Sequence, residues 1–131
     1  MALSVRFALT LHRCLTASVR GRFAASRLRP NTAMRTILMG DIIAAARAIL
    51  VLPAAEQLCF LQIMLGQTHA AHLFHKHKKR PHPKWGNGSL MARANAEPQV
   101  PEPFASNLAY LQALQKVIGA LILRSMQAAA R

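Results

Sequence analysis

Two segments rich in proline and glycine limit where regular structure can form in this chain of 131 residues. Residues 81–88 contain Pro81, Pro83 and the run Gly86-Asn87-Gly88, and residues 97–103 contain three more prolines. Proline lacks a backbone N–H and biases the preceding residue away from helix, so neither segment can continue a helix or form a central strand. The sequence therefore predicts a long structured connection in which the second segment is an extended surface strap.

Upstream of these segments, apolar residues recur every three or four positions, as they do on one face of a helix. The first predicted helix follows Asp41 and ends near Pro53, with Asp41 as the N-cap because its carboxylate can accept the free N–H groups of the first turn. Its expected inward face consists of Ile42, Ala45, Ala46, Ile49 and Leu52. The second predicted helix starts at Ala54 and runs to the lysines after His75, with Leu58, Leu61, Met64 or Leu65, and Ala71 on one face.

Two more helices are predicted downstream. Ser89 can cap a short helix from Leu90 to Asn95, and Ser106 or Asn107 can cap the last one. The expected inward face of the last helix consists of Leu111, Leu114, Ile118 and Leu121, widened by Leu108 and Ile122. No stretch alternates for long enough to be a strand. The predicted fold class is all-α: a small bundle of three main helices with a long Pro/Gly-rich structured connection.

Residues 1–33 differ from the rest because they carry six arginines but no lysine and no acidic residue. One interpretation is that Met34 is the true start and that this basic extension lies upstream of the protein. A mitochondrial presequence has the same Arg-rich, acid-free composition, and a folded basic helix is a third alternative. Residues 34–131 are predicted to be a single small helical domain. Its location is expected to be cytoplasmic, or the mitochondrial matrix if residues 1–33 are a presequence.

The chain has 17 Lys and Arg residues against four Asp and Glu residues, a formal net charge of +13, so it should be attracted to polyanions. Residues 69–90, here called the basic arm, hold five of the six histidines and the only tryptophan. We expect a non-catalytic interaction module that contacts a protein partner through this arm; the alternative is a nucleic-acid-binding accessory protein that uses Lys76–Lys84 and Trp85. The predicted contact residues are Lys76, Lys78, Lys79, Arg80, His82, Lys84 and Trp85.

Other chemistry has weaker support. His69 and His72 would project from one helix face, with His75 one turn on, and such spacing can bind a metal. However, no acidic residue lies among them to orient the imidazoles, so they are weak candidates and we expect no metal or cofactor. Four acidic residues give no convincing catalytic pair, so an enzyme is not expected. No transmembrane segment is predicted, and the Ala- and Leu-rich last helix leaves a homodimer open.

The string His82-Pro83-Lys84-Trp85-Gly86-Asn87-Gly88-Ser89-Leu90 resembles a motif of a short, uncharacterised bacterial family, a domain of unknown function. The resemblance extends to Met34-Arg35-Thr36-Ile37-Leu38-Met39-Gly40-Asp41, Leu52-Pro53, Ala71-His72, Pro101-Glu102-Pro103 and Tyr110-Leu111. It covers residues 34–131 and leaves residues 1–33 outside. It implies a bacterial, cytoplasmic protein, and it brings no activity, cofactor or catalytic residue.

Overall fold

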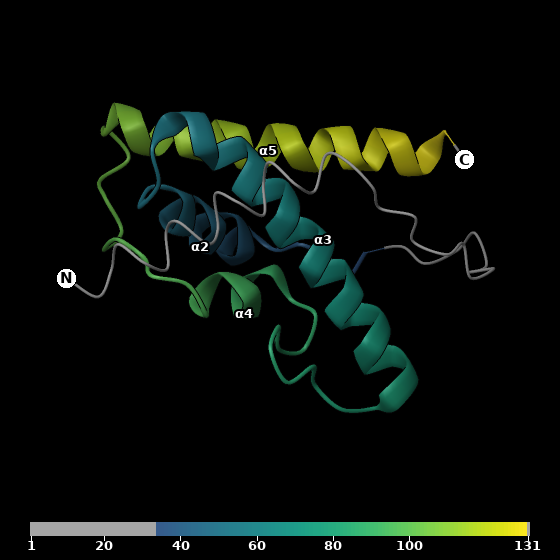
Figure 1. Cartoon of the computed structure of the whole chain (residues 1–131). Helices are drawn as coiled ribbons and strands as arrows, with labels where there is room; N and C mark the ends of the chain where they lie inside the picture. Colours follow the sequence, from purple (N-terminus) through teal and green to yellow (C-terminus); the bar gives the residue numbers. More distant parts are fainter. Residues whose placement is uncertain (1–33, 131) are drawn as a thin grey trace. The chain divides into compact units, whose positions relative to one another are not determined.

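The computed structural model describes residues 34–130, which form four α-helices (Figure 1). The helices are α2 (Met39–Ile49), α3 (Ala54–Lys78), α4 (Leu90–Asn95) and α5 (Leu108–Ala129). This part of the chain contains no named strand, only one isolated antiparallel bridge between His82 and Gly86. The all-α class is therefore confirmed for the described residues. The prediction for residues 1–33 falls outside them.

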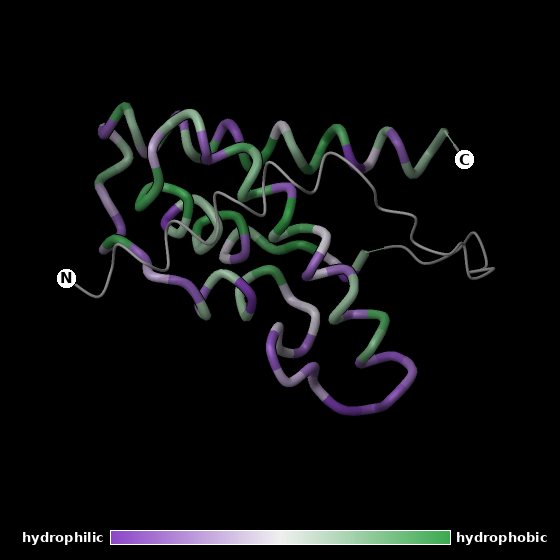
Figure 2. Tube along the Cα trace, in the orientation of Figure 1, coloured by the Kyte–Doolittle hydropathy of each residue, from purple (hydrophilic) through white to green (hydrophobic). Residues whose placement is uncertain are grey.

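The core is built around α2, which packs mainly against α4 and α5. Four alanines of α2 are buried together with Ile49, and their small side chains allow close approach of the neighbouring helices. The larger fully buried side chains come from all four helices: Ile49, Leu61, Met64, Leu90 and Val117. Figure 2 shows the apolar colour on α2 and on the parts of the other helices that surround it. None of the described helices is long and apolar enough to cross a membrane.

The start of α2 differs from the prediction. Its N-cap is Leu38, and Asp41 is buried at the third helical position, where its Oδ2 accepts the Leu38 N–H at 2.8 Å. Its Oδ1 accepts the N–H of Met91, in the first turn of α4, also at 2.8 Å. One carboxylate therefore satisfies N–H groups at the start of two helices. A Cβ at Gly40 would lie 2.7 Å from Met91 Cε, the end of a flexible side chain that can move aside.

The inward faces of the longer helices were predicted only in part. In α3, Leu61, Met64, Leu65 and Ala71 are buried as expected, whereas Leu58 is exposed. In α5 the buried residues are Tyr110, Ala113 and Val117; Leu114 and Leu121 pack at the edge of the core. Four residues expected to face the core are instead exposed: Leu108, Leu111, Ile118 and Ile122. The helix is rotated from the predicted orientation, so that Tyr110, Ala113 and Val117 face the core in which the four alanines of α2 are also buried.

Local capping was predicted more accurately. Ser89 caps α4 through a hydrogen bond from the Ala92 N–H, and Asn107 caps α5 through one from the Tyr110 N–H. Between these helices, the strap of residues 97–103 is held on α2, where Arg47 Nε donates to the Val100 carbonyl at 2.8 Å.

Candidate functional site

The C-terminal part of α3 carries the start of the basic arm beyond the core. Thr68 and Ala71 are its last buried residues, and the side chains of residues 76–81 are exposed. Figure 1 shows this end of α3, and the loop that follows, projecting away from the other helices. Lys79 ends the helix in the left-handed conformation (φ 57°) and donates its N–H to the His75 carbonyl at 2.9 Å. Figure 2 shows that this projecting region is predominantly hydrophilic.

Residues 82–86 form a closed loop within the basic arm. His82 and Gly86 donate their N–H groups to each other's carbonyls at 2.8 and 3.0 Å. Inside the loop, His82 Nδ1 accepts the N–H groups of Lys84 and Trp85 at 3.1 and 3.2 Å. Gly86 has φ 74°, a conformation that side chains rarely adopt, and this allows the chain to close. Because His82 fixes two backbone N–H groups, the loop has one defined shape.

The aromatic side chains of the arm contact one another. The His82 and Trp85 rings stack with centroids 4.4 Å apart and an angle of 9° between their planes. Phe74 of α3 meets His82 edge-on at 5.0 Å, and the guanidinium carbon of Arg80 lies 5.9 Å from the centre of the Phe74 ring. Trp85 therefore neither stands free nor joins the core, because His82 covers one face of its ring. Its indole is half-buried.

The loop returns to the body of the domain across α3. Gly88 has φ 85° and lies so close to His72 that a Cβ would be 2.4 Å from the His72 Cα. Asn87 Oδ1 then accepts the Ser89 N–H at 3.0 Å, immediately before α4 begins. The Arg35 side chain donates to the Asn87 carbonyl at 3.3 Å. The Gly86-Asn87-Gly88 run is therefore a structural connection that is held between the loop and α4.

The predicted contact residues divide into two groups. Lys76, Lys78, Lys79, Arg80 and Lys84 are exposed, whereas His82 and Trp85 are half-buried against each other. None of these five cations takes part in a salt bridge with another described residue. The salt bridge found among residues 34–130 joins Arg93 and Glu97. Residues 57–96 contain no acidic residue at all. The arm therefore presents uncompensated positive charge to solvent.

The histidines nearer the core are biased towards the neutral form. Burial lowers the pKa of His69 below its ordinary value of 6.5, and the charges of Arg124 and His72 lower it further. Burial likewise lowers the pKa of His72, assisted by Lys76, Arg35 and His75. The Nδ1 atom of His69 is buried without a hydrogen-bond partner. At neutral pH, His69 and His72 therefore add little to the positive charge that the lysines and arginines of the arm carry.

The weak metal-ligand candidates His69, His72 and His75 do not come together as a metal site in the structure. Within residues 34–130, no three His, Cys, Asp or Glu side chains come together as ligands for a metal ion.

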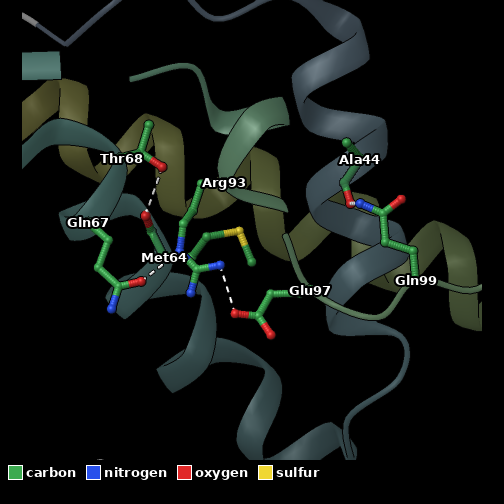
Figure 3. A network of polar contacts seen from close by, with 7 residues as sticks. All are labelled: Ala44, Met64, Gln67, Thr68, Arg93, Glu97 and Gln99. Carbon is green, nitrogen blue, oxygen red and sulfur yellow. Dashed lines mark hydrogen bonds and ion pairs between the residues drawn. The ribbon is translucent and has the colours of Figure 1, made fainter. Parts of the chain in front are cut away.

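A polar network beside the arm was not anticipated from the sequence (Figure 3). Arg93 is buried; its Nε donates to Gln67 Oε1 and its Nη1 pairs with Glu97 Oε1, both at 2.7 Å. Figure 3 shows the guanidinium of Arg93 between the Gln67 and Glu97 side chains. Arg93 and Glu97 have the i, i+4 spacing of helical ion pairs, and this spacing is the feature of the sequence from which their salt bridge could have been predicted. The network joins α3 to α4 and fixes the base of the arm.

The described residues thus define a small all-α domain with a cationic arm that contains a closed loop. The chain belongs to the family described as Domain of unknown function (DUF7742), whose model matches residues 35–121. The match contains the whole basic arm and ends within α5, and residues 1–33 lie outside it. The expectation of an uncharacterised family is therefore confirmed. No curated protein and no solved structure matches the chain.

Proposed function

We propose that this protein is a non-catalytic interaction module that docks an acidic partner protein through the basic arm. The observation that carries the proposal is the set of five exposed cations, at residues 76–84, that no described acidic side chain neutralises. Such a surface raises the local concentration of anionic partners and speeds their association. The end of α3, the closed loop and the Gly88 contact with α3 fix the backbone that carries these side chains, which reduces the backbone entropy lost on binding.

A nucleic-acid-binding accessory protein is the second candidate. The same cations, close to Trp85, favour it, because phosphate contacts combined with base stacking are the usual basis of single-strand binding. His82 already occupies one face of the Trp85 ring, so at most one face can receive a base. This limited stacking surface is why we place an acidic protein first.

The cellular setting belongs to the same proposal. We place the module in the bacterial cytoplasm, supported by the resemblance over residues 34–131. Its compact unit is a bundle of three main helices, α2, α3 and α5, because these supply most of the buried core. Determining the N-terminal residue of the mature chain tests the setting: an end near residues 25–35 without an initiator methionine would indicate organellar processing instead.

The test measures binding of the full chain to a labelled polyglutamate and to short DNA and RNA oligonucleotides at two salt concentrations. If all five cations contact phosphates, raising salt from 50 to 200 mM should weaken binding roughly 500-fold for duplex DNA and roughly 130-fold for a single strand. The arm variant replaces Lys78, Lys79 and Arg80 by glutamine. The control replaces Arg6, Arg13 and Arg20 by glutamine, which removes the same charge outside the arm.

The two candidates predict different results. Docking to an acidic protein predicts that polyglutamate binds, that the arm variant loses at least tenfold in affinity, and that the control loses much less. Nucleic-acid binding predicts that oligonucleotides bind more tightly than polyglutamate and that Trp85→Leu weakens only the oligonucleotide. Equal losses in the arm variant and the control would show that net charge alone is responsible and would reject both candidates.

A further inference from the structure

A cavity lies between α3 and α5, where the two helices move apart. The Lys116 ammonium of α5 donates to Gln57 Oε1, near the start of α3, at 2.7 Å. Figure 1 shows the two helices separating from there towards their C-terminal ends. The cavity has a volume of about 240 Å³ and opens to solvent, since three of its lining residues are exposed. Two residues of α3 and four of α5 line it: Gln62, Leu65, Ala120, Leu123, Arg124 and Gln127.

Helical spacing gathers these residues on one face of each helix. The four residues of α5 are related by spacings of three, four and seven positions, so they share a face. In α3, the face that contains Gln62 and Leu65 continues one turn later with His69. Arg124 lies close enough to His69 for its charge to lower the pKa of His69. His69 therefore lies on the same side of α3 as the cavity.

Arg124 is the one charged residue that lines the cavity, and no other described residue forms a hydrogen bond or an ion pair with it. Helix α5 has no acidic residue, and Glu56, the one acidic residue of α3, lies nearly two turns before Gln62. Burial lowers the pKa of Arg124, because the charged form loses hydration there. Nearby, the Nδ1 atom of His69 is buried without a hydrogen-bond partner among the described residues. A half-buried cation that no acid neutralises is a binding point for an anion.

The lining selects the class of anion. The cavity carries one positive charge, because burial and Arg124 bias His69 towards its neutral form. A carboxylate balances that charge, whereas a phosphate group carries about −1.5 to −2 at pH 7. The guanidinium fork also binds a carboxylate through two parallel hydrogen bonds. Pockets for drug-sized ligands have volumes of about 300–1,000 Å³, so a cavity of about 240 Å³ takes a smaller molecule.

We propose that this cavity binds a small organic monocarboxylate, with its carboxylate on the Arg124 guanidinium. The amides of Gln62 and Gln127 can donate to the remaining lone pairs of the carboxylate. The short apolar body of the ligand packs against the three apolar residues of the lining, Leu65, Ala120 and Leu123. None of the six lining residues belongs to the basic arm, so this site goes beyond the docking function proposed above and does not depend on it.

Titration of the ¹⁵N-labelled full chain with hexanoate, followed by NMR at pH 7 and constant ionic strength, tests the proposal. The amide shifts should saturate and should be centred on Leu65, Leu123 and Arg124. The expected dissociation constant is on the order of 1 mM, since the ligand has only about eight heavy atoms. Hexanol lacks the charge, acetate lacks the apolar body and inorganic phosphate has the wrong charge. Each of the three should bind at least tenfold more weakly than hexanoate.

The pKa of His69 gives a second readout. A bound carboxylate neutralises the Arg124 charge that lowers this pKa, so the pKa of His69 should rise when hexanoate saturates the protein. The imidazole signals of His69 report it. In Arg124→Gln, hexanoate should leave the pKa of His69 unchanged.

Variants assign the binding to the cavity. Arg124→Gln should weaken hexanoate binding at least tenfold, and Arg124→Lys should fall between this variant and the wild type, because lysine keeps the charge but not the planar fork. Lys116→Gln is the matched control: it removes the same charge from α5 outside the cavity and should bind hexanoate like the wild type. The arm variant, with Lys78, Lys79 and Arg80 replaced by glutamine, should also bind hexanoate normally.

Four results would overturn the proposal. The first is an absence of saturable shifts, and the second is a set of shifts confined to the basic arm. The third is an equal loss in Arg124→Gln and Lys116→Gln, which would indicate attraction by net charge alone. The fourth is equally tight binding of hexanol or phosphate. Circular dichroism confirms that each variant retains its helices, and if Arg124→Gln does not fold, Arg124→Lys and the comparison of ligands decide.

Discussion

Asp41 shows how one side chain can determine the start of two helices. Its two carboxylate oxygens accept N–H groups from Leu38 and Met91, and the side chain is buried. The sequence indicated that Asp41 lies at a helix start, and Asp41 was expected to be the N-cap. The sequence could not reveal the hydrogen bond from Met91, because Met91 is 50 residues away and no local pattern relates it to Asp41.

We expect Asp41→Ala to lower the free energy of unfolding by about 2–4 kcal/mol, because two buried hydrogen bonds to a charged group are lost. Asp41→Asn should cost about half as much, since an amide offers only one acceptor oxygen. Chemical denaturation measures both. Glu56→Ala is the control: Glu56 also lies in a first helical turn, and it should cost less than about 1 kcal/mol. Similar losses in Asp41→Ala and Glu56→Ala would contradict the double-capping role.

His69 should make stability depend on pH. Its pKa is lowered in the folded state by burial and by Arg124, so the unfolded chain binds more protons between that lowered pKa and about 6.5. The contribution of His69 to stability is therefore complete above pH 6.5 and is lost as the pH falls through the lowered pKa. Denaturation at pH 7.5 and 5.0 should show a smaller difference in His69→Gln than in the wild type. His77→Gln, at an exposed position, should leave the difference unchanged.

At the scale of elements, the caps of α4 and α5 were predicted correctly and the rotation of α5 was not. Ser89 and the following Leu90–Asn95 helix were predicted with the observed bounds, because a cap and a short apolar run are recorded in adjacent residues. The inward face of α5 was predicted from the spacing of its leucines and isoleucines, yet Tyr110, Ala113 and Val117 face the core. Which face is buried depends on the alanine surface of α2, and a sequence pattern in α5 contains no information about that partner.

The Gly86-Asn87-Gly88 run of the basic arm predicts a contrast between two glycines. Gly88→Ala should be severely destabilising or should detach the arm locally, because its Cβ would overlap the His72 backbone at 2.4 Å. Gly86→Ala should cost only about 1–2 kcal/mol, since it adds left-handed strain and a 3.0 Å contact with a side-chain methyl group. Thermal denaturation, with Trp85 fluorescence as a probe of the arm, distinguishes them. Gly66→Ala in α3, where nothing lies within 4 Å, should be neutral or slightly stabilising. Equal effects at Gly86 and Gly88 would refute the role of the close contact.

For the whole molecule, the sequence was sufficient to predict an all-α domain, and the basic arm was recognisable as a concentration of charge. The sequence could not show that His82 fixes two backbone N–H groups and covers Trp85, because these contacts depend on the exact course of the chain. Nor could it show Arg93 between Gln67 and Glu97, which requires α3 and α4 to lie side by side.

The bond between Asp41 and Met91 also bears on the order in which the protein folds. A helix of six residues such as α4 is too short to persist alone, so it depends on a contact that closes a loop of 50 residues. The arm lies inside that loop, and α4 should therefore form after α2 and α3 have packed. The same dependence makes α4 and the arm the first segments to open from the native state. Their amide protons should exchange with solvent by local opening, well before those of α2.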